Sequence, residues 1–209
     1  MMLTKLHKPF LKFVNDREGT SIVEFAVISP VMFTLLFGGF DFGHTLYMQS
    51  VLQGSVNKAA RDSALETGTV EEVQAAVDQK VIDQVTAVHR TAEFNADSFS
   101  RTYFRTFTDA AFPESEVWDD TNGDGECNND ENYIDENNNS SFDADGIADG
   151  QGYTRDAVKY SATISYDRLF PLAGLLGVSD RVTLTASTVI ANQPYGQKAA
   201  AITRKCEDA

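Results

Sequence analysis

The stretch Arg17-Glu18-Gly19-Thr20-Ser21-Ile22-Val23-Glu24-Phe25 runs directly into an apolar segment and decides how this chain is organised. Over residues 22–40 the only charged residue is Glu24. As a helix, this segment is about 28 Å long, which is enough to cross the hydrocarbon core of a bilayer. A carboxylate inside a span is costly unless a partner neutralises it, so Glu24 is a candidate functional residue. The plainer interpretation is a simple membrane anchor in which Glu24 occurs by chance.

The charges on either side of the apolar segment predict its orientation. Residues 1–19 carry a net charge of +2 and the whole chain carries −14, which leaves −16 for residues 20–209. Basic residues are retained on the cytoplasmic side of a membrane. We therefore expect a cytoplasmic N-terminus and an acidic domain on the outer side, which in a bacterial cell is the periplasm. Because that compartment is oxidising, Cys127 and Cys206 are expected to form one disulfide, with two free thiols as the alternative.

Apolar periodicity predicts the secondary structure beyond the span. An apolar stripe continues the first helix to about residue 66, although Pro30 is expected to kink or locally melt it. Strict alternation over residues 158–166 and 182–190 predicts two strands, and Phe99, Tyr103 and Phe107 indicate a less regular one. A second helix is predicted from a stripe of valines: Val70, Val73, Val77, Val81, Val85 and Val88.

These elements predict an α+β fold in three parts. Residues 1–19 form a basic leader, and residues 20–66 form a membrane-spanning helix that extends beyond the bilayer. Residues 67–209 form a periplasmic domain in which an antiparallel sheet packs on helices. This domain contains an acidic loop at residues 114–150, with thirteen Asp or Glu residues and no Lys or Arg. A loop of this composition is most simply disordered and solvated.

The spacing of oxygen-bearing residues in the acidic loop instead predicts a calcium site. Residues 120–131 match the twelve-residue EF-hand loop, with Gly125 at the sixth position, where a turn is needed. Calcium takes six to eight oxygen ligands, so alternate side chains must encircle it. The expected ligands are Asp120, Asn122, Asp124, the Glu126 carbonyl, Asn128 and Glu131.

A second, looser array follows the first and could bind another calcium ion. Its candidate ligands are Asp135, Asn137, Asn139 and Asp143. It lacks the glycine at the sixth position and the glutamate at the twelfth. No amphipathic helices flank either loop, so both resemble the helix-free calcium loops of extracellular repeats. We expect calcium, where bound, to order the loop rather than to act as a switch.

The sequence offers no enzyme active site and no nucleic-acid surface. His7, His44 and His89 lie in the leader, near the membrane exit and on the second helix, so they form no evident metal triad or acid–base pair. There is no glycine-rich phosphate loop, and a net charge of −16 outside the leader disfavours nucleic acid. We therefore expect a non-enzymatic protein.

Several short motifs, taken in order, resemble the TadE-like pseudopilin family of the tight-adherence (Flp) type IV pilus machinery. They are Gly19 with Glu24 five residues later, Phe25-Ala26, Pro30, Tyr166-Asp167-Arg168-Leu169-Phe170-Pro171, Asn192-Gln193-Pro194-Tyr195 and the late Cys206. The resemblance implies that a prepilin peptidase cuts between Gly19 and Thr20, which makes Glu24 the fifth residue of the mature chain. It also implies residence in the bacterial inner membrane.

The same resemblance implies a minor pseudopilin or accessory subunit of an adhesive pilus. Its expected partners are the peptidase, other pilins or pseudopilins, the pilus assembly platform and the membrane. It could remain in the membrane or enter a surface pilus. The alternative function is a membrane-anchored, calcium-dependent surface adhesin or binding module. Cleavage distinguishes the two, because an anchored adhesin keeps its original N-terminus.

Overall fold

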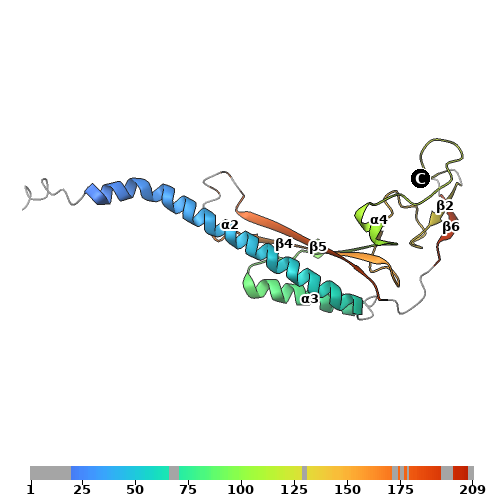
Figure 1. Cartoon of the computed structure of the whole chain (residues 1–209), viewed down its shortest axis with the longest axis horizontal. Helices are drawn as coiled ribbons and strands as arrows, with labels where there is room; N and C mark the ends of the chain where they lie inside the picture. Colours follow the sequence, from blue (N-terminus) through green and yellow to red (C-terminus); the bar gives the residue numbers. More distant parts are fainter. Residues whose placement is uncertain are drawn as a thin grey trace, which may run out of the picture. The chain divides into compact units, whose positions relative to one another are not determined.

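The computed structural model describes residues 20–65, 71–128, 131–170, 174, 177, 179–193 and 200–206 (Figure 1). The leader, Gly19 and Val70 lie outside these residues. The elements, in chain order, are α2 (Thr20–Leu65), α3 (Glu71–Val88), η2 (Ala96–Ser98), β1 (Phe99–Phe104), α4 (Phe107–Ala111), β2 (Asn132–Asp135), β3 (Ala148–Asp149), β4 (Ala157–Asp167), β5 (Arg181–Ala191) and β6 (Ile202–Lys205).

The chain divides into two compact units. One contains Met1–His44 and Arg168–Asp180, and the other contains Thr45–Asp167 and Arg181–Ala209. The boundary falls within α2, so the beginning of this helix belongs to the first unit and its remainder to the second.

The second unit is built on a four-stranded antiparallel sheet with the strand order β3-β1-β4-β5. The two long strands pair over eleven residues, from Ala157 opposite Ala191 to Asp167 opposite Arg181. A separate two-stranded sheet pairs β2 with β6. The predicted strands at 158–166 and 182–190 are therefore confirmed as β4 and β5, and the α+β fold class is confirmed with them.

Helices α2 and α3 supply the other half of the core (Figure 1). Val77, Val81 and Val85 of the predicted valine stripe are buried, whereas Val88 is exposed. Alternate residues of β4 point into the same core. The buried cluster comprises Met48, Leu52, Val56, Ala59, Ala60, Val77, Val81, Val85, Tyr160, Ala162, Ile164, Tyr166, Val182 and Ala186. The antiparallel sheet thus packs against helices, as predicted.

Helix α2 continues through Pro30, so of the kink or local melting that we expected there, the melting does not occur. Proline has no N–H to donate to the carbonyl four residues earlier, which here belongs to Ala26. The Ser29 hydroxyl donates to that carbonyl at 3.4 Å, and the Thr34 hydroxyl donates to the Pro30 carbonyl at 2.8 Å. Side-chain hydroxyls therefore meet the backbone groups around the proline, as they commonly do in membrane helices.

A largely buried polar cluster connects α3 to the sheet. The Arg101 guanidinium donates to both carboxylate oxygens of Asp78, at 2.6 and 3.1 Å, and the Tyr160 hydroxyl donates to Asp78 at 2.6 Å. Arg101 also lies over the Tyr160 ring, 4.7 Å from its centroid. Burial raises the pKa of the Tyr160 hydroxyl, and its hydrogen bond to Asp78 raises it further. Arg101 and Tyr160 therefore both depend on Asp78 as a hydrogen-bond acceptor.

We predict that Asp78→Ala destabilises the protein strongly, because it leaves the Arg101 charge largely buried without its carboxylate. The expected loss in the free energy of unfolding is about 3 kcal/mol. The matched control is Asp62→Ala, which breaks the exposed ion pair between Asp62 and Lys80 and should cost less than about 1 kcal/mol. Urea unfolding of the full chain in detergent, followed by circular dichroism, measures both. Equal small losses would contradict a structural role for the cluster.

Candidate functional site

The acidic segment is ordered around a short antiparallel ladder. Strand β2 pairs with β6 on one side, and Trp118 forms a bridge with Tyr133 on the other. The Asp119 N–H donates to the Asn132 carbonyl and the Ile134 N–H donates to the Val117 carbonyl, both at 2.8 Å. The rings of Trp118 and Tyr133 pack edge-on against Phe142. Among the described residues, the segment is therefore a folded structure rather than a solvated coil.

In the first predicted calcium loop, side-chain oxygens accept hydrogen bonds from a series of backbone N–H groups within the loop. Asp120 accepts from the N–H groups of Gly123 and Gly125, at 2.7 and 3.0 Å. Asn122 accepts from Asp124 at 2.8 Å, and Asp124 accepts from Glu126 at 2.8 Å. Gly125 has φ +80°, which few residues other than glycine adopt readily. The structure thus brings the predicted ligands together around one loop.

Glu131, at the twelfth position, closes this loop from within. Its side chain is 3% exposed, and its carboxylate accepts the N–H groups of Thr121, Asn122 and Asn128 at 2.8, 3.2 and 3.4 Å. The side-chain amide of Asn128 donates to Asp124 at 3.0 Å, and this bond holds the pKa of Asp124 below its usual range. Rotating that amide would present its oxygen instead of its nitrogen. The donor set consists of hard oxygens, which suits calcium.

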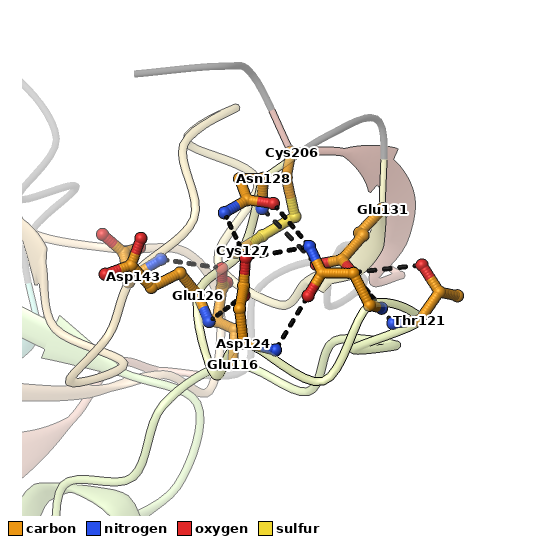
Figure 2. Close-up of a disulfide and its surroundings, with 10 residues drawn as sticks. Glu116, Thr121, Asp124, Glu126, Cys127, Asn128, Glu131, Asp143 and Cys206 are labelled. Carbon is orange, nitrogen blue, oxygen red and sulfur yellow. Dashed lines mark hydrogen bonds between the residues drawn. A yellow bond between two sulfur atoms is a disulfide. The ribbon is translucent and has the colours of Figure 1, made fainter.

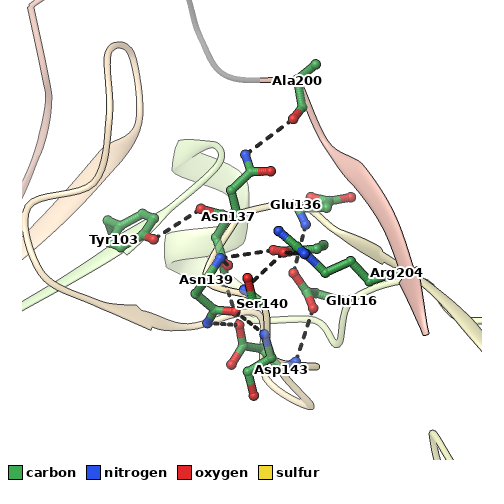
Figure 3. A network of polar contacts seen from close by, with 12 residues as sticks. Tyr103, Glu116, Glu136, Asn137, Asn139, Ser140, Asp143, Ala200 and Arg204 are labelled. Carbon is green, nitrogen blue, oxygen red and sulfur yellow. Dashed lines mark hydrogen bonds and ion pairs between the residues drawn. The ribbon is translucent and has the colours of Figure 1, made fainter. Parts of the chain in front are cut away.

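The second loop repeats this arrangement at the predicted positions (Figure 3). Asp135, which is 0% exposed, accepts the N–H groups of Asn139 and Ser140 at 3.1 and 3.0 Å. Asn137 accepts from Asn139 at 2.9 Å, and Asp143 accepts from the side-chain amides of both asparagines. Ser140 takes the place of the sixth-position glycine with φ +69°. The missing glycine therefore does not prevent the turn.

Glu116 takes the place of the missing twelfth-position glutamate in the second loop. It is 4% exposed, and it accepts the N–H groups of Glu136 and Asp143 at 2.8 and 3.1 Å, at the second and ninth positions. Glu131 accepts at the same two positions in the first loop. Burial raises the pKa of Glu116, and the charges of Asp143 and Asp135 raise it further, while its two N–H donors lower it. The sequence analysis did not find this residue.

The sequence contains a short internal repeat that could have identified Glu116 as a candidate ligand. The stretches Glu116-Val117-Trp118-Asp119-Asp120 and Glu131-Asn132-Tyr133-Ile134-Asp135 share a glutamate two residues before an aromatic residue and an aspartate two residues after it. The two aromatic residues face each other in the antiparallel bridge. Antiparallel pairing sets the glutamate of each stretch beside the aspartate of the other. The glutamate of each repeat therefore accepts hydrogen bonds from the loop that begins at the aspartate of the other repeat.

Strand β6 holds both loops. The disulfide between Cys127 and Cys206, predicted from the sequence, is confirmed, with 5.4 Å between the Cα atoms, and it fastens the first loop (Figure 2). The Arg204 guanidinium contacts Asp135 of the second loop at 2.5 Å. Tyr103 donates to the Asn137 carbonyl at 3.2 Å, and burial is the main cause that raises its pKa to about 12. Within the described ranges, no three His, Cys, Asp or Glu side chains are arranged as a metal site.

The second candidate site is the head of α2. Thr20 is the first residue of the helix, and Glu24 follows one turn later. Gly19, on the other side of the expected cleavage point, lies outside the described residues. The apolar side chains that follow, including Ile22, Val27 and Leu35, are exposed. In the part of the chain that the structure describes, α2 is the one helix long and apolar enough to cross a membrane.

Residues 19–61 match the family model described as TadE-like protein. This segment of the chain is TadE-like. The match begins at Gly19 and covers Glu24, Pro30 and most of α2, so the resemblance predicted from the sequence is confirmed there. No curated protein and no solved structure matches the chain. The sheet and the acidic loops lie outside the matched residues.

Proposed function

We propose that this protein is a minor pseudopilin or accessory subunit in the assembly of the tight-adherence (Flp) pilus. The observation that carries the proposal is the TadE-like match that begins at Gly19. We further propose that a prepilin peptidase cuts between Gly19 and Thr20. The N-terminus is cytoplasmic before cleavage, the span lies in the bacterial inner membrane, and the C-terminal domain is periplasmic. The partners are other pilins or pseudopilins and the assembly platform, and no enzymatic activity is involved.

Glu24 supplies a physical reason for assembly. Cleavage would leave an ammonium group on Thr20, four residues before Glu24 and therefore on the same face of the helix. A carboxylate within lipid is costly unless it is protonated or paired. The ammonium of the same subunit, or that of a neighbouring helix, can neutralise it. Pairing between subunits would set their helices in register. A shift of one helix along the axis of the other would leave both charges in lipid unpaired.

We propose that the two acidic loops bind structural calcium. The first loop would use Asp120, Asn122, Asp124, the Glu126 carbonyl, Asn128 and Glu131. The second would use Asp135, Asn137, Asn139 and Asp143, completed by Glu116. The buried positions of Glu116, Glu131 and Asp135 support the proposal, because buried carboxylates gain most from a nearby positive charge. The bound cation would neutralise the loops and hold them in the conformation that the N–H bonds already favour.

The first test concerns processing. Mature protein from the native host should begin at Thr20, and Gly19→Asp should remain at full length because a pocket for a small residue excludes an aspartate. Gly19→Ala is the matched control and should still be cut. N-terminal sequencing of protein from membranes and from sheared surface fibres measures both processing and location. A native chain that begins at Met1 or Met2 would instead favour the anchored adhesin.

The second test concerns Glu24. Glu24→Gln keeps the side-chain shape but removes the charge, so the variant should be inserted and cut normally yet fail to co-purify with pilus components. Glu18→Gln is the matched control: it makes the same chemical change in the segment that cleavage removes, and it should assemble like wild type. Surface adhesion and co-purification from crosslinked membranes provide the measurements. Normal assembly of the Glu24 variant would remove the charge-pairing argument.

The third test concerns calcium. Because a ligand that binds only the folded state stabilises it, calcium at a hundred times Kd should add about 2.7 kcal/mol per site and raise the melting temperature. Calorimetric titration of the full chain in detergent should count two sites. Asp120→Ala with Asp124→Ala should remove the first site, and Glu116→Gln should remove the second.

The control for calcium binding is Glu114→Gln, which removes an exposed carboxylate of the same segment that is not an expected ligand. It should keep both sites. For each variant, the melting temperature in calcium is compared with the melting temperature of the same variant in chelator. This is needed because removing carboxylates also changes the stability of the calcium-free protein. Equal melting temperatures in calcium and in chelator for the wild type would contradict the proposal.

A further inference from the structure

We propose that the protein touches the bilayer at a second place, through Leu169 and Phe170 in the connection between β4 and β5. The partner is lipid, in the leaflet at the C-terminal end of the α2 span. The inference rests on α2 being the membrane span, but it does not depend on cleavage, on pilus partners or on calcium. All the contacts that carry it lie within the unit formed by Met1–His44 and Arg168–Asp180.

The first observation is an aromatic contact with the span itself. The Phe170 ring stacks on Phe37, with 4.8 Å between the ring centroids, and Phe37 stacks in turn on Phe33 at 5.8 Å. Phe37 is three residues before Phe40, where the apolar segment ends, so it lies about 4.5 Å inside the end of the span. If the apolar segment is in the bilayer, Phe170 must be at the same depth, inside the boundary of the hydrocarbon.

The second observation is that charged groups hold the base of this connection at the end of the span. The Arg168 guanidinium forms an ion pair with Asp41, the first charged residue after the apolar segment. Its Nε also donates to the Ser179 carbonyl at 3.0 Å, and its backbone N–H donates to the Asp180 carbonyl at 2.8 Å. Arg168 therefore fastens both ends of the connection to the turn of α2 where headgroups would begin.

The third observation is the composition of the connection between these charges. Residues 169–178 include no charged residue, and Asp167 and Arg168 precede them while Asp180 and Arg181 follow. Leu169 is 50% exposed, and Leu36 and Phe40 of α2 are also exposed. An exposed apolar surface rimmed by charges marks a contact with a membrane or a protein. Here it is continuous with the surface of the span, which faces lipid, so lipid is the occupant that the geometry favours.

Tryptophan fluorescence tests this directly, because the chain has a single tryptophan, Trp118. In a Trp118→Phe background, Phe170→Trp reports on the connection in full-length protein reconstituted into phosphatidylcholine vesicles with brominated acyl chains. Phe33→Trp is the positive control within the span. Phe112→Trp is the negative control, since Phe112 is 72% exposed in the other unit. Leu169→Trp is a second probe that removes no buried packing.

We expect blue-shifted emission from Phe170→Trp and Leu169→Trp, quenched by the brominated chains to an extent comparable with Phe33→Trp, and no quenching of Phe112→Trp. Water-like, unquenched emission from both probes would overturn the inference while leaving the span intact. Blue-shifted emission without quenching would also overturn it, because a second protein copy would then cover the surface. If the emission of Phe33→Trp were not quenched, α2 would not be the membrane span, and the inference would fail with it.

Discussion

Helix α2 carries two different apolar surfaces, one exposed and one buried in the core, and the rest of the structure depends on the second. Over residues 22–40 the apolar residues occupy all sides of the helix and most are exposed, which suits lipid. Further along, Met48, Leu52 and Val56 form one buried stripe, while Gln49 and Gln53 donate to the backbone carbonyls of Thr185 and Ser187 in β5. The same helix is therefore a candidate membrane span first and a core element afterwards.

This change of role also explains the sheet. A four-stranded sheet with one exposed apolar face would not be stable in water, and α2 and α3 together cover that face. The match to TadE-like proteins ends within α2 at residue 61, so it includes the whole buried stripe from Met48 to Ala60. The part of the chain that resembles a family is thus the helix that joins the apolar segment to the core, and the acidic loops lie outside the matched residues.

Periodic sequence patterns predicted the long elements of this fold. The elements that they missed are short or depend on pairing with distant residues. Strands β4 and β5 alternate over residues 158–166 and 182–190, so local sequence specified most of their length. The expectation that Phe107 continues a strand was wrong: Thr106 and Asp109 form a capping box that starts α4 there. Strands β2 and β6 have four residues each, too few for a clear period.

Glu116 could not be assigned from spacing along the chain, because it serves a loop that begins at Asp135. Its role appears only when the bridge between Trp118 and Tyr133 is known. Antiparallel pairing of two similar stretches exchanges their glutamates, whereas a search for ligands within each twelve-residue window assumes that a loop supplies its own. The first loop fits that assumption only because of its position in the sequence. Glu131 is both the twelfth residue of the first loop and the first residue of the second repeat.

The two proposed calcium loops differ in the charge that surrounds their carboxylates. Each has three candidate carboxylate ligands: Asp120, Asp124 and Glu131 in the first, and Asp135, Asp143 and Glu116 in the second. In the second loop Arg204 already contacts Asp135 and offsets part of the negative charge. Because ligand charge is one of the factors that set calcium affinity, the first loop should bind more tightly. The disulfide fastens the first loop at Cys127 to Cys206, directly after β6, the strand that carries Arg204.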